Sequence, residues 1–388
     1  MSTGLFHIEM LPAAHGDCIL VSYGRAESPR FVLIDTGPIS TYPEVRTRLR
    51  ELALPRVELL VLSHIDSDHI EGAIKLLNDR DLGLTFGESW FNGWPQLSQP
   101  IQADVPLVGS APPQRGPLQG EYVGVRLTDS ATAWNSRFGG RAVVVPDVGA
   151  LPRVALPDGL TLTLLSPSAE KLVALRAAWS KAADARGFDP GNTAENRDKL
   201  GRDTRYRGRR GDPDERQLDR QVATAVDNQL DGAVANGSSI AFIAEFGEKR
   251  CAFLADAHMP VIERSLARLA EERGEEKLRL DAVKVSHHGS RGNTTRSFLD
   301  RIDCDTYLVS TDGSRFGHPD DEAIERILER GATGTRLVFN YRSKKNAKWA
   351  SEELQRERRY TAEYPPSKAR GIAIDLMDQR SPALERRL

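Results

Sequence analysis

Short runs of apolar and β-branched residues alternate with amphipathic stretches along most of the chain. In the first hundred residues these runs are bounded by Gly, Pro or Asp, a pattern typical of buried strands. They lie at residues 6–10, 18–23, 31–34 and 59–62. Apolar residues three or four positions apart predict a helix over 43–52, capped by Thr41, and a second helix from Asp68 to Leu77.

The same alternation returns in the second half of the chain. Apolar runs predict strands at residues 160–165, 239–246, 250–254, 282–285, 306–309 and 336–339. Amphipathic spacing predicts helices at 261–272 and 320–329. Two strand-rich portions that are each mixed with helices favour a layered α/β protein.

Two stretches interrupt this pattern. Residues 92–155 are rich in Pro, Gly and Gln and predict a long insertion with little regular structure. Residues 186–220 predict a second insertion, in which residues 197–210 contain seven Lys or Arg and two Asp, a net charge of +5. Low hydrophobicity combined with like charge predicts a flexible, solvated segment.

Composition excludes several classes of protein. Of the 388 residues, 39% are hydrophobic and 28% are charged, which excludes a wholly disordered chain. Lys and Arg number 53 and Asp and Glu 55, a net charge of −2, so binding of nucleic acid would require local basic patches. The length suits two or three domains or one large α/β sandwich with insertions.

The chain shows no signal for export or for a membrane. No apolar window approaches the roughly 18 to 20 residues that a membrane helix needs. The first residues lack the basic and apolar regions of a signal peptide. Cys18, Cys251 and Cys304 form no CxxC pair. We therefore expect a cytoplasmic protein with reduced thiols and no membrane contact.

The densest cluster of metal-binding side chains follows the strand predicted at 59–62. Within six residues the chain contains His64, Asp66, Asp68 and His69. Side chains at the end of a strand and on the first turn of a helix can converge on one point, which is the geometry that a metal site needs. A single Asp at a helix start is most often an N-cap, but two His and two Asp this close together favour a metal site.

This cluster resembles the His-x-His-x-Asp-His signature of the metallo-β-lactamase superfamily. Further motifs are similar to those of one branch, the metallohydrolase domain of the ComEC DNA-uptake proteins and its soluble bacterial relatives. They follow in family order over roughly residues 5–340: Gly16-Asp17, Asp35-Thr36-Gly37, Asn236-Gly237-Ser238, Asp256, His287-His288-Gly289-Ser290 and Gly317-His318-Pro319.

The resemblance implies a four-layer αββα metallo-β-lactamase sandwich. Residues 1–388 would form a single domain of this fold, with the two insertions at about 92–155 and 186–220. A basic extension would follow at about 341–388.

The resemblance also implies a site for one or two divalent cations. His64 and Asp66 would hold one ion, Asp68, His69 and His287 the other, and Asp256 would bridge them. Asp35 would orient a ligand imidazole. His287 is preferred to His288 because it is the first residue past the strand, while His288 and His258 stay alternatives as ligands or as partners of ligands.

Two positions depart from the family pattern. Asp66 stands where most members have their second His, and Asn236 and its neighbours stand where the third His would be. Three His and three Asp make a donor set rich in carboxylate, which favours Mn²⁺ or Mg²⁺ relative to Zn²⁺. The identity of the metal therefore stays open among these three ions.

The resemblance favours phosphodiesters, and DNA in particular, as the substrate of a metal-activated water. His318 would bind a phosphate or protonate the leaving oxygen, beside the catalytic Asp68 and Asp35. Asn236, Ser238, Ser290 and Asn293 would contact the substrate. Residues 342–359 contain seven Lys or Arg and three Glu, a net charge of +4, and Trp349 and Tyr360 there would stack on bases.

Two other functions stay open. The chain could hydrolyse a small molecule such as a lactone, a β-lactam or a thioester, or it could bind a partner without catalysis. The Arg-rich segment at 186–220 could also regulate the enzyme, through cleavage by an activating protease at Arg205, Arg207, Arg209 or Arg210.

Overall fold

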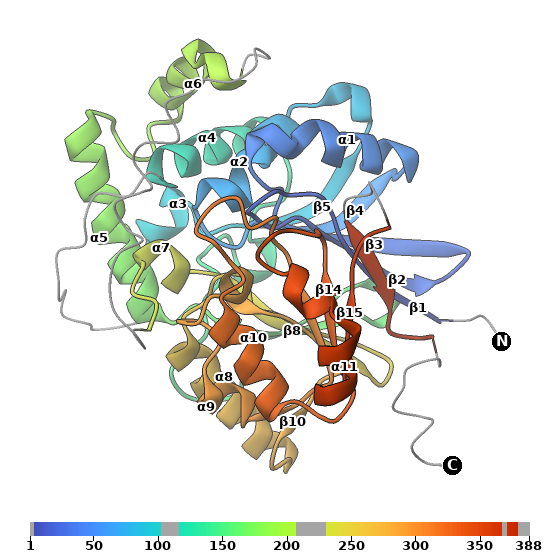
Figure 1. Cartoon of the computed structure of the whole chain (residues 1–388). Coiled ribbons are helices and arrows are strands. Elements are labelled where there is room, and N and C mark those ends of the chain that lie inside the picture. The colour runs from blue at the N-terminus through green and yellow to red at the C-terminus, as the bar shows by residue number, and fades with distance from the viewer. Residues whose placement is uncertain (1–3, 102–115, 207–229, 367–370, 379–388) are drawn as a thin grey trace.

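The computed structural model describes residues 4–101, 116–206, 230–366 and 371–378 (Figure 1). Two large sheets dominate this part of the chain. The first has the strand order β16-β1-β2-β3-β4-β5 and the second the order β15-β14-β13-β11-β9-β8-β7-β6. A third, two-stranded sheet pairs β10 (Leu278–Arg279) with β12 (Ile302–Asp303).

The first sheet combines an antiparallel and a parallel half. Strands β1, β2 and β3 pair antiparallel, whereas β3, β4 and β5 pair parallel. β4 is buried over five of its six residues, because a parallel strand inside a covered sheet has no solvated face. The strands of this sheet are β1 (Gly4–Met10), β2 (Ile19–Arg25), β3 (Ser28–Ile34), β4 (Arg56–Val61), β5 (Thr85–Trp90) and β16 (Ile372–Asp375).

The second sheet is built from the later part of the chain. β6, β7, β8 and β9 pair antiparallel, and β9, β11, β13, β14 and β15 pair parallel. The strands are β6 (Arg153–Ala155), β7 (Thr161–Ser166), β8 (Ala241–Phe246), β9 (Lys249–Phe253), β11 (Ala282–Lys284), β13 (Thr306–Val309), β14 (Thr335–Phe339) and β15 (Tyr360–Glu363).

The sheets lie face to face with helices on both outer sides (Figure 1). Apolar side chains of both sheets, such as Ile8 and Phe242, form one core with the helices α8 (Met259–Arg273) and α10 (Asp321–Arg330). A second core joins the first sheet to α1 (Tyr42–Glu51), α2 (Ser67–Leu76), α4 (Gly116–Asp129) and α5 (Ala169–Arg186). The predicted αββα sandwich is confirmed.

The first insertion contains more regular structure than its composition predicts. α4 packs between α2 and α5, and Tyr122 and Val123 of α4 lie in the second core. Short helical and extended elements complete the described part, namely α3 (Trp94–Leu97), a 3₁₀ turn at Ser136–Phe138 and β6. The prediction of little regular structure was wrong here, because apolar positions of α4 are covered by neighbouring helices despite the Gly and Pro around them.

The second insertion also begins with a helix. α6 (Thr193–Arg202) starts at Asn192, whose side chain accepts a hydrogen bond from the Glu195 amide. Arg197 forms an ion pair with Asp129 of α4. The predicted flexibility is therefore wrong over α6, since local capping and ion pairs stabilise a helix of low hydrophobicity. The cleavage positions Arg207, Arg209 and Arg210 lie outside the described residues, whereas Arg205 pairs with Asp203.

The basic extension is part of both sheets. β15 adds a parallel strand to β14, and β16 adds an antiparallel strand to β1. Trp349 and Tyr360 are buried, and the Tyr360 hydroxyl donates to the Trp349 carbonyl over 3.0 Å. The prediction that these two rings stack on bases was wrong, because both rings close the core beside β14. Within the described ranges, none of the helices combines the length and apolar character of a membrane span.

Trp349 should therefore act on stability. We expect Trp349→Ala to lower the free energy of unfolding by about 3–5 kcal/mol, since it removes a large buried side chain. Urea titration followed by circular dichroism measures the change. The control is Lys344→Ala, at an exposed position in the same extension, which should change stability by less than about 0.5 kcal/mol. Equal effects of both changes would contradict a core role for Trp349.

Candidate metal centre

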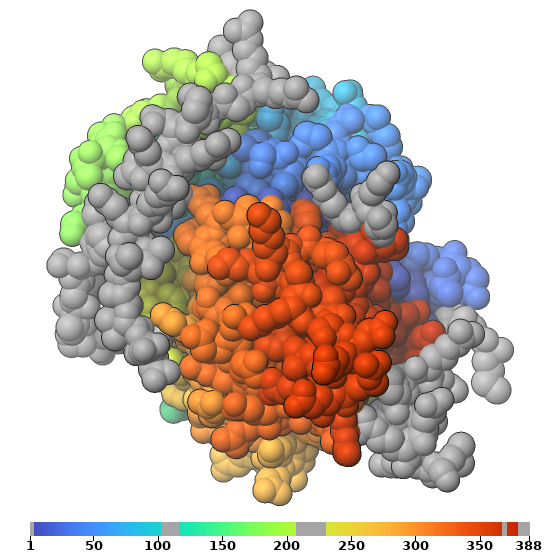
Figure 2. Space-filling view, viewed as in Figure 1, coloured from blue at the N-terminus to red at the C-terminus, as the bar shows by residue number. Residues whose placement is uncertain are grey.

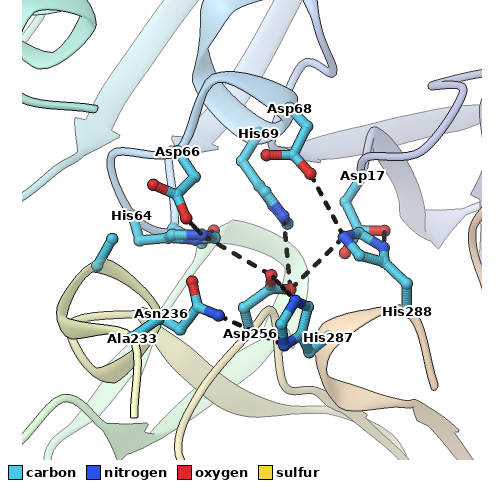
Figure 3. A network of polar contacts seen from close by, with 12 residues as sticks. Asp17, His64, Asp66, Asp68, His69, Ala233, Asn236, Asp256, His287 and His288 are labelled. Atoms are coloured by element: carbon cyan, nitrogen blue, oxygen red, sulfur yellow. Dashed lines mark hydrogen bonds and ion pairs between the residues drawn. The ribbon is translucent and has the colours of Figure 1, made fainter. Parts of the chain in front are cut away.

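The candidate site lies where β4, β9 and β11 end (Figure 3). His64 and Asp66 follow β4, and Asp68 and His69 are on the first turn of α2. Asp66 is the N-cap residue of α2, but its side chain makes no capping hydrogen bond. Its carboxylate lies 3.6 Å from His64 Nε2 instead, so the motif does not serve as a helix cap.

One group of donors surrounds the Oδ1 atom of Asp256. His69 Nε2 lies 3.4 Å and His288 Nε2 3.8 Å from this oxygen. His288 Nε2 also lies 3.8 Å from Asp68 Oδ2. Atoms of Asp68, His69 and His288 lie within 4.8 Å of one another, so these three side chains could share one cation.

A second group surrounds the other oxygen of Asp256. Oδ2 lies 3.9 Å from His64 Nε2 and 3.7 Å from His287 Nε2. Asp66 is next to His64 at the half-exposed edge of this group. Since each oxygen of Asp256 faces a different group, this carboxylate would contribute an oxygen to each group if both held a cation.

The two adjacent histidines take different places from those the resemblance implied. His288, and not His287, lies with Asp68 and His69. Both residues have left-handed backbone angles, with φ of 46° and 55°, and their rings are 5.9 Å apart with planes at 70°. Proximity to the strand end was a poor criterion, because this turn directs the two imidazoles to opposite sides of Asp256.

Each imidazole of the centre is oriented through its Nδ1 atom. His69 Nδ1 is 2.8 Å from Asp35 Oδ2, and His288 Nδ1 is 2.8 Å from the Ser310 carbonyl. His64 Nδ1 is 3.0 Å from Ser63 Oγ, which donates to Asp35 over 2.7 Å. Since these partners accept hydrogen bonds, Nδ1 carries a proton and Nε2 is the ring nitrogen that faces the centre.

Several atoms of the centre lack a partner within the described part of the protein. The buried Nε2 atoms of His64, His69 and His288 and the Oδ1 atom of Asp256 accept or donate no hydrogen bond there. Leaving four buried polar atoms unsatisfied is costly, and native proteins rarely do so. All four are ligand atoms that face one another, so the residues present fit divalent cations.

The charges of the centre also suit a cation. Burial alone would raise the pKa of Asp256, but His69, His287 and His288 hold it well below its usual value. The pKa of Asp68 is lowered in the same way, against the effect of burial. Burial would lower the pKa of His69, yet Asp256 and Asp35 raise it well above the usual value. The carboxylates are therefore ionised, and protons on the histidines compete with metal.

His287 has its own set of partners. Its Nδ1 lies 3.2 Å from Asp231 Oδ2 and 3.1 Å from Asn293 Oδ1. Asn236 and Asn293 both donate to Asp231 Oδ2, over 2.8 and 3.1 Å. Burial would lower the pKa of His287, but Asp256 and Asp231 raise it to about 10. Asp231 was missed in the sequence because it belongs to no motif and follows the low-hydrophobicity segment.

These contacts change the interpretation of four residues expected to bind substrate. The amides of Asn236 and Asn293 hold Asp231 against His287. Ser238 is buried and donates to the Ala235 carbonyl over 2.6 Å, and Ser290 Oγ accepts from the Gly292 amide over 3.3 Å. The structure thus gives all four side chains internal partners, and the two Asn help to position His287 through Asp231.

His258 and His318 lie outside the two donor groups. His258 Nε2 is 2.9 Å from the Ala233 carbonyl, at the start of α8. The His318 ring lies 5.2 Å from that of His287, and its Nδ1 is 3.5 Å from Asp320. Burial lowers the pKa of His318. His318 therefore stands at the edge of the centre as a neutral imidazole.

A buried ion pair lies next to His288 of the centre. Lys284, fully buried in β11, donates to Asp17 Oδ2 over 2.5 Å. The other oxygen of Asp17 is 3.5 Å from His288 Nδ1. Burial would raise the pKa of Asp17, but Lys284 and His288 hold it far below the usual value. This pair joins the loop after β1 in the first sheet to β11 in the second, and no pattern in the sequence predicted it.

Comparison with known proteins finds matches among solved structures only. No family model and no curated protein matches the chain. The solved structure of the metallo-β-lactamase fold protein YhfI from Bacillus subtilis is 10% identical, with a TM-score of 0.41 over 95% of this chain and 98% of that one. Zn²⁺-bound PqqB from Methylobacterium extorquens is 13% identical, with a TM-score of 0.40 over 95% and 99%.

A third solved structure, a variant of the β-hydroxylase CmlA, is 13% identical with a TM-score of 0.37. The match covers 94% of this chain and 53% of that one. All three TM-scores are below 0.5. The description of the fold therefore rests on the sheet order and layers of this protein itself.

The two donor groups predict metal binding that depends on Asp256 and His288. We expect the purified protein to take up about two equivalents of Zn²⁺ or Mn²⁺, with release of protons in weakly buffered solution. Asp256→Ala should abolish tight binding, and His288→Ala should reduce the metal content by about half. Mass spectrometry of the dialysed protein measures both. The control His258→Ala should keep the full content, and an equal loss there would contradict this ligand set.

The buried ion pair of Asp17 and Lys284 predicts that removing one partner destabilises the protein more than replacing both partners. Lys284→Ala should lower the free energy of unfolding by about 3–5 kcal/mol, because it leaves a buried carboxylate without its partner. The double change Asp17→Leu with Lys284→Met should recover most of that loss. Denaturant titration of the metal-free proteins compares the two. A double variant less stable than Lys284→Ala would exclude this explanation.

Proposed function

We propose that the protein is a metal-dependent hydrolase that cleaves phosphodiester bonds, with DNA as its substrate. The observation that supports hydrolysis most strongly is the set of buried, partnerless ligand atoms around Asp256. The resemblance of the motifs to the ComEC metallohydrolase domain supports DNA. Divalent cations bound here would supply hydroxide near neutral pH and would stabilise a leaving oxyanion.

The donor set supports Zn²⁺ or Mn²⁺ over Mg²⁺. Four imidazoles, those of His64, His69, His287 and His288, face Asp256, one more than the sequence suggested. Imidazole suits transition metals, whereas Mg²⁺ prefers oxygen ligands and retained waters. The ions would be held by these four side chains with Asp66, Asp68 and Asp256.

The residues around the donors have distinct parts in this reaction. Asp35 contacts His69 directly and His64 through Ser63, and it thereby keeps each imidazole in one tautomer. Asp231 does the same for His287. His318, whose pKa burial lowers, would donate a hydrogen bond as a neutral imidazole from the edge of the centre to a substrate oxygen.

Basic side chains beside the centre support an anionic substrate. Arg315 lies on the loop that contains His318, and Lys345 lies against that loop. A Cβ atom placed on Gly317 would be 3.1 Å from Lys345 Nζ, so this ammonium lies over the loop. Cations next to a metal site attract phosphodiesters and would have no role toward a neutral lactone.

The function is tested by incubating plasmid and single-stranded DNA with the purified protein and Mn²⁺, Zn²⁺ or Mg²⁺. We expect cleavage with Mn²⁺ or Zn²⁺, none with EDTA, and a loss of about 1,000-fold or more when Asp68→Ala and His69→Ala are combined. Gel electrophoresis measures the products. If DNA stays intact with every ion while a lactone or thioester is hydrolysed, the enzyme acts on small molecules.

The basic loop gives a second prediction. Lys345→Glu should raise KM for DNA by about tenfold and leave kcat nearly unchanged, because the charge attracts substrate without touching the reacting atoms. Arg356→Glu on α11 (Glu352–Arg358) is the matched charge reversal on an exposed helix and should have little effect. Initial rates at low salt measure both. Equal effects of the two reversals would argue against a local role for Lys345.

A further inference from the structure

An exposed aromatic ring stands beside the metal centre. Phe316 lies on the loop between β13 and α10, and its side chain is 45% exposed. Among the described residues, three large apolar side chains are exposed, and the other two are Val148 and Leu230. Phe316 is therefore the one aromatic side chain in this exposed set, and the core of the protein does not explain its position.

The backbone of Phe316 is strained. Its φ is 57°, in the left-handed region that a bulky side chain rarely adopts. Glycine would adopt this angle without strain, and a glycine follows at position 317 with φ of 78°. Strain of this kind persists where the surroundings fix it, and it concentrates at sites of binding and catalysis.

The ring contacts two residues that adjoin the centre. One neighbour is His15, whose ring centroid is 6.5 Å away, and the next residue, Gly16, packs directly against the backbone of Asp68. The other neighbour is His318, whose ring is 6.3 Å away at an interplanar angle of 27° and lies 5.2 Å from the ring of His287. Phe316 is therefore one residue removed from the centre on the Asp68 side and on the His287 side.

Positive charge lies close to the same ring. The Arg315 guanidinium carbon lies over the Phe316 ring, 5.3 Å from its centroid, and Arg315 Nη1 lies 3.2 Å from His15 Nε2. Lys345 lies against the neighbouring Gly317. A partly exposed aromatic ring with cations next to it suits a ligand that joins a planar ring to an anion, and a nucleotide has both parts.

We infer that Phe316 is a stacking platform for a base of a single-stranded nucleic-acid substrate, placed so that the adjoining phosphate reaches the metal centre. This inference rests on the proposed phosphodiesterase function and adds the residue that selects for bases. It also replaces Trp349 and Tyr360, which are buried, as the aromatic contact with substrate. Phe316 is a residue that positions the substrate and takes no part in proton transfer.

The experiment measures binding without turnover. A labelled phosphorothioate oligonucleotide, which resists hydrolysis, is titrated with metal-loaded protein and followed by fluorescence anisotropy. Phe316→Tyr should bind within about twofold of the wild type, whereas Phe316→Leu and Phe316→Gly should bind about tenfold more weakly, the scale of one base–aromatic stack. Leucine keeps the apolar contact and loses only the aromatic face, so it is the matched control.

Two further readouts separate a binding role from a structural one. The melting temperature of Phe316→Gly should stay close to that of the wild type, because the backbone strain that glycine relieves is about as large as the entropy that glycine adds to the unfolded chain. An oligonucleotide with abasic residues should bind the wild type about tenfold more weakly and should no longer distinguish Phe316→Gly from it. In hydrolysis of normal DNA, the variants should raise KM and leave kcat nearly unchanged.

The outcomes distinguish the inference from the proposed function. Equal binding by the Leu and Tyr variants, or a clear fall in melting temperature for Phe316→Gly, would overturn the platform even if DNA is cleaved. Base-dependent binding that requires an aromatic residue at 316 would support the platform even if no ion gives cleavage, and the proposed function alone would then fail. A wild type that neither binds nor cleaves DNA would overturn both.

Discussion

The arrangement of the candidate metal centre depends on the carboxylate of Asp256, which contacts side chains from both sheets. It is buried between four imidazoles, and each of its oxygens faces a different pair of them. A buried carboxylate in contact with several histidines is costly unless charge compensates it. Divalent cations would supply that charge and would engage every partnerless atom of the cluster. The residues around Asp256 therefore fit divalent cations.

Holding this site together requires that two sheets keep a fixed relation. His64 and His69 belong to the first sheet and its helix α2, whereas Asp256 and His288 follow strands of the second sheet. The apolar core between the sheets packs their inner faces together. The buried pair of Asp17 and Lys284 adds a polar link between the loop after β1 and β11, and Asp17 lies 3.5 Å from His288. Such a pair stabilises one alignment even where its net energy is small.

Sequence alone predicted the parts that are local. The strand before His64 and the helix from Asp68 follow from periodicity. The resemblance implied the αββα layers, and it placed Asp35 beside a ligand imidazole, where the structure has it next to His69. What the sequence could not predict depends on contacts distant along the chain. Lys284 is 267 positions from Asp17, and Asp231 is 56 from His287. Trp349 and Tyr360 lie in a basic segment, yet their rings close the core.

Several residues near the candidate metal centre have strained, left-handed backbone angles. Among the left-handed non-glycine residues of the described part, Asp35 follows β3, Ala255 follows β9, His287 and His288 follow β11, and Phe316 lies on the loop after β13. The first four lie at or next to residues of the candidate metal centre, and the ring of Phe316 neighbours that of His318. Strain at such positions must be offset by the two cores and persists because it aims side chains at a common point. Phe316 has the same strain but aims outward, which is what a surface for substrate requires and what a ligand of the metal would not do.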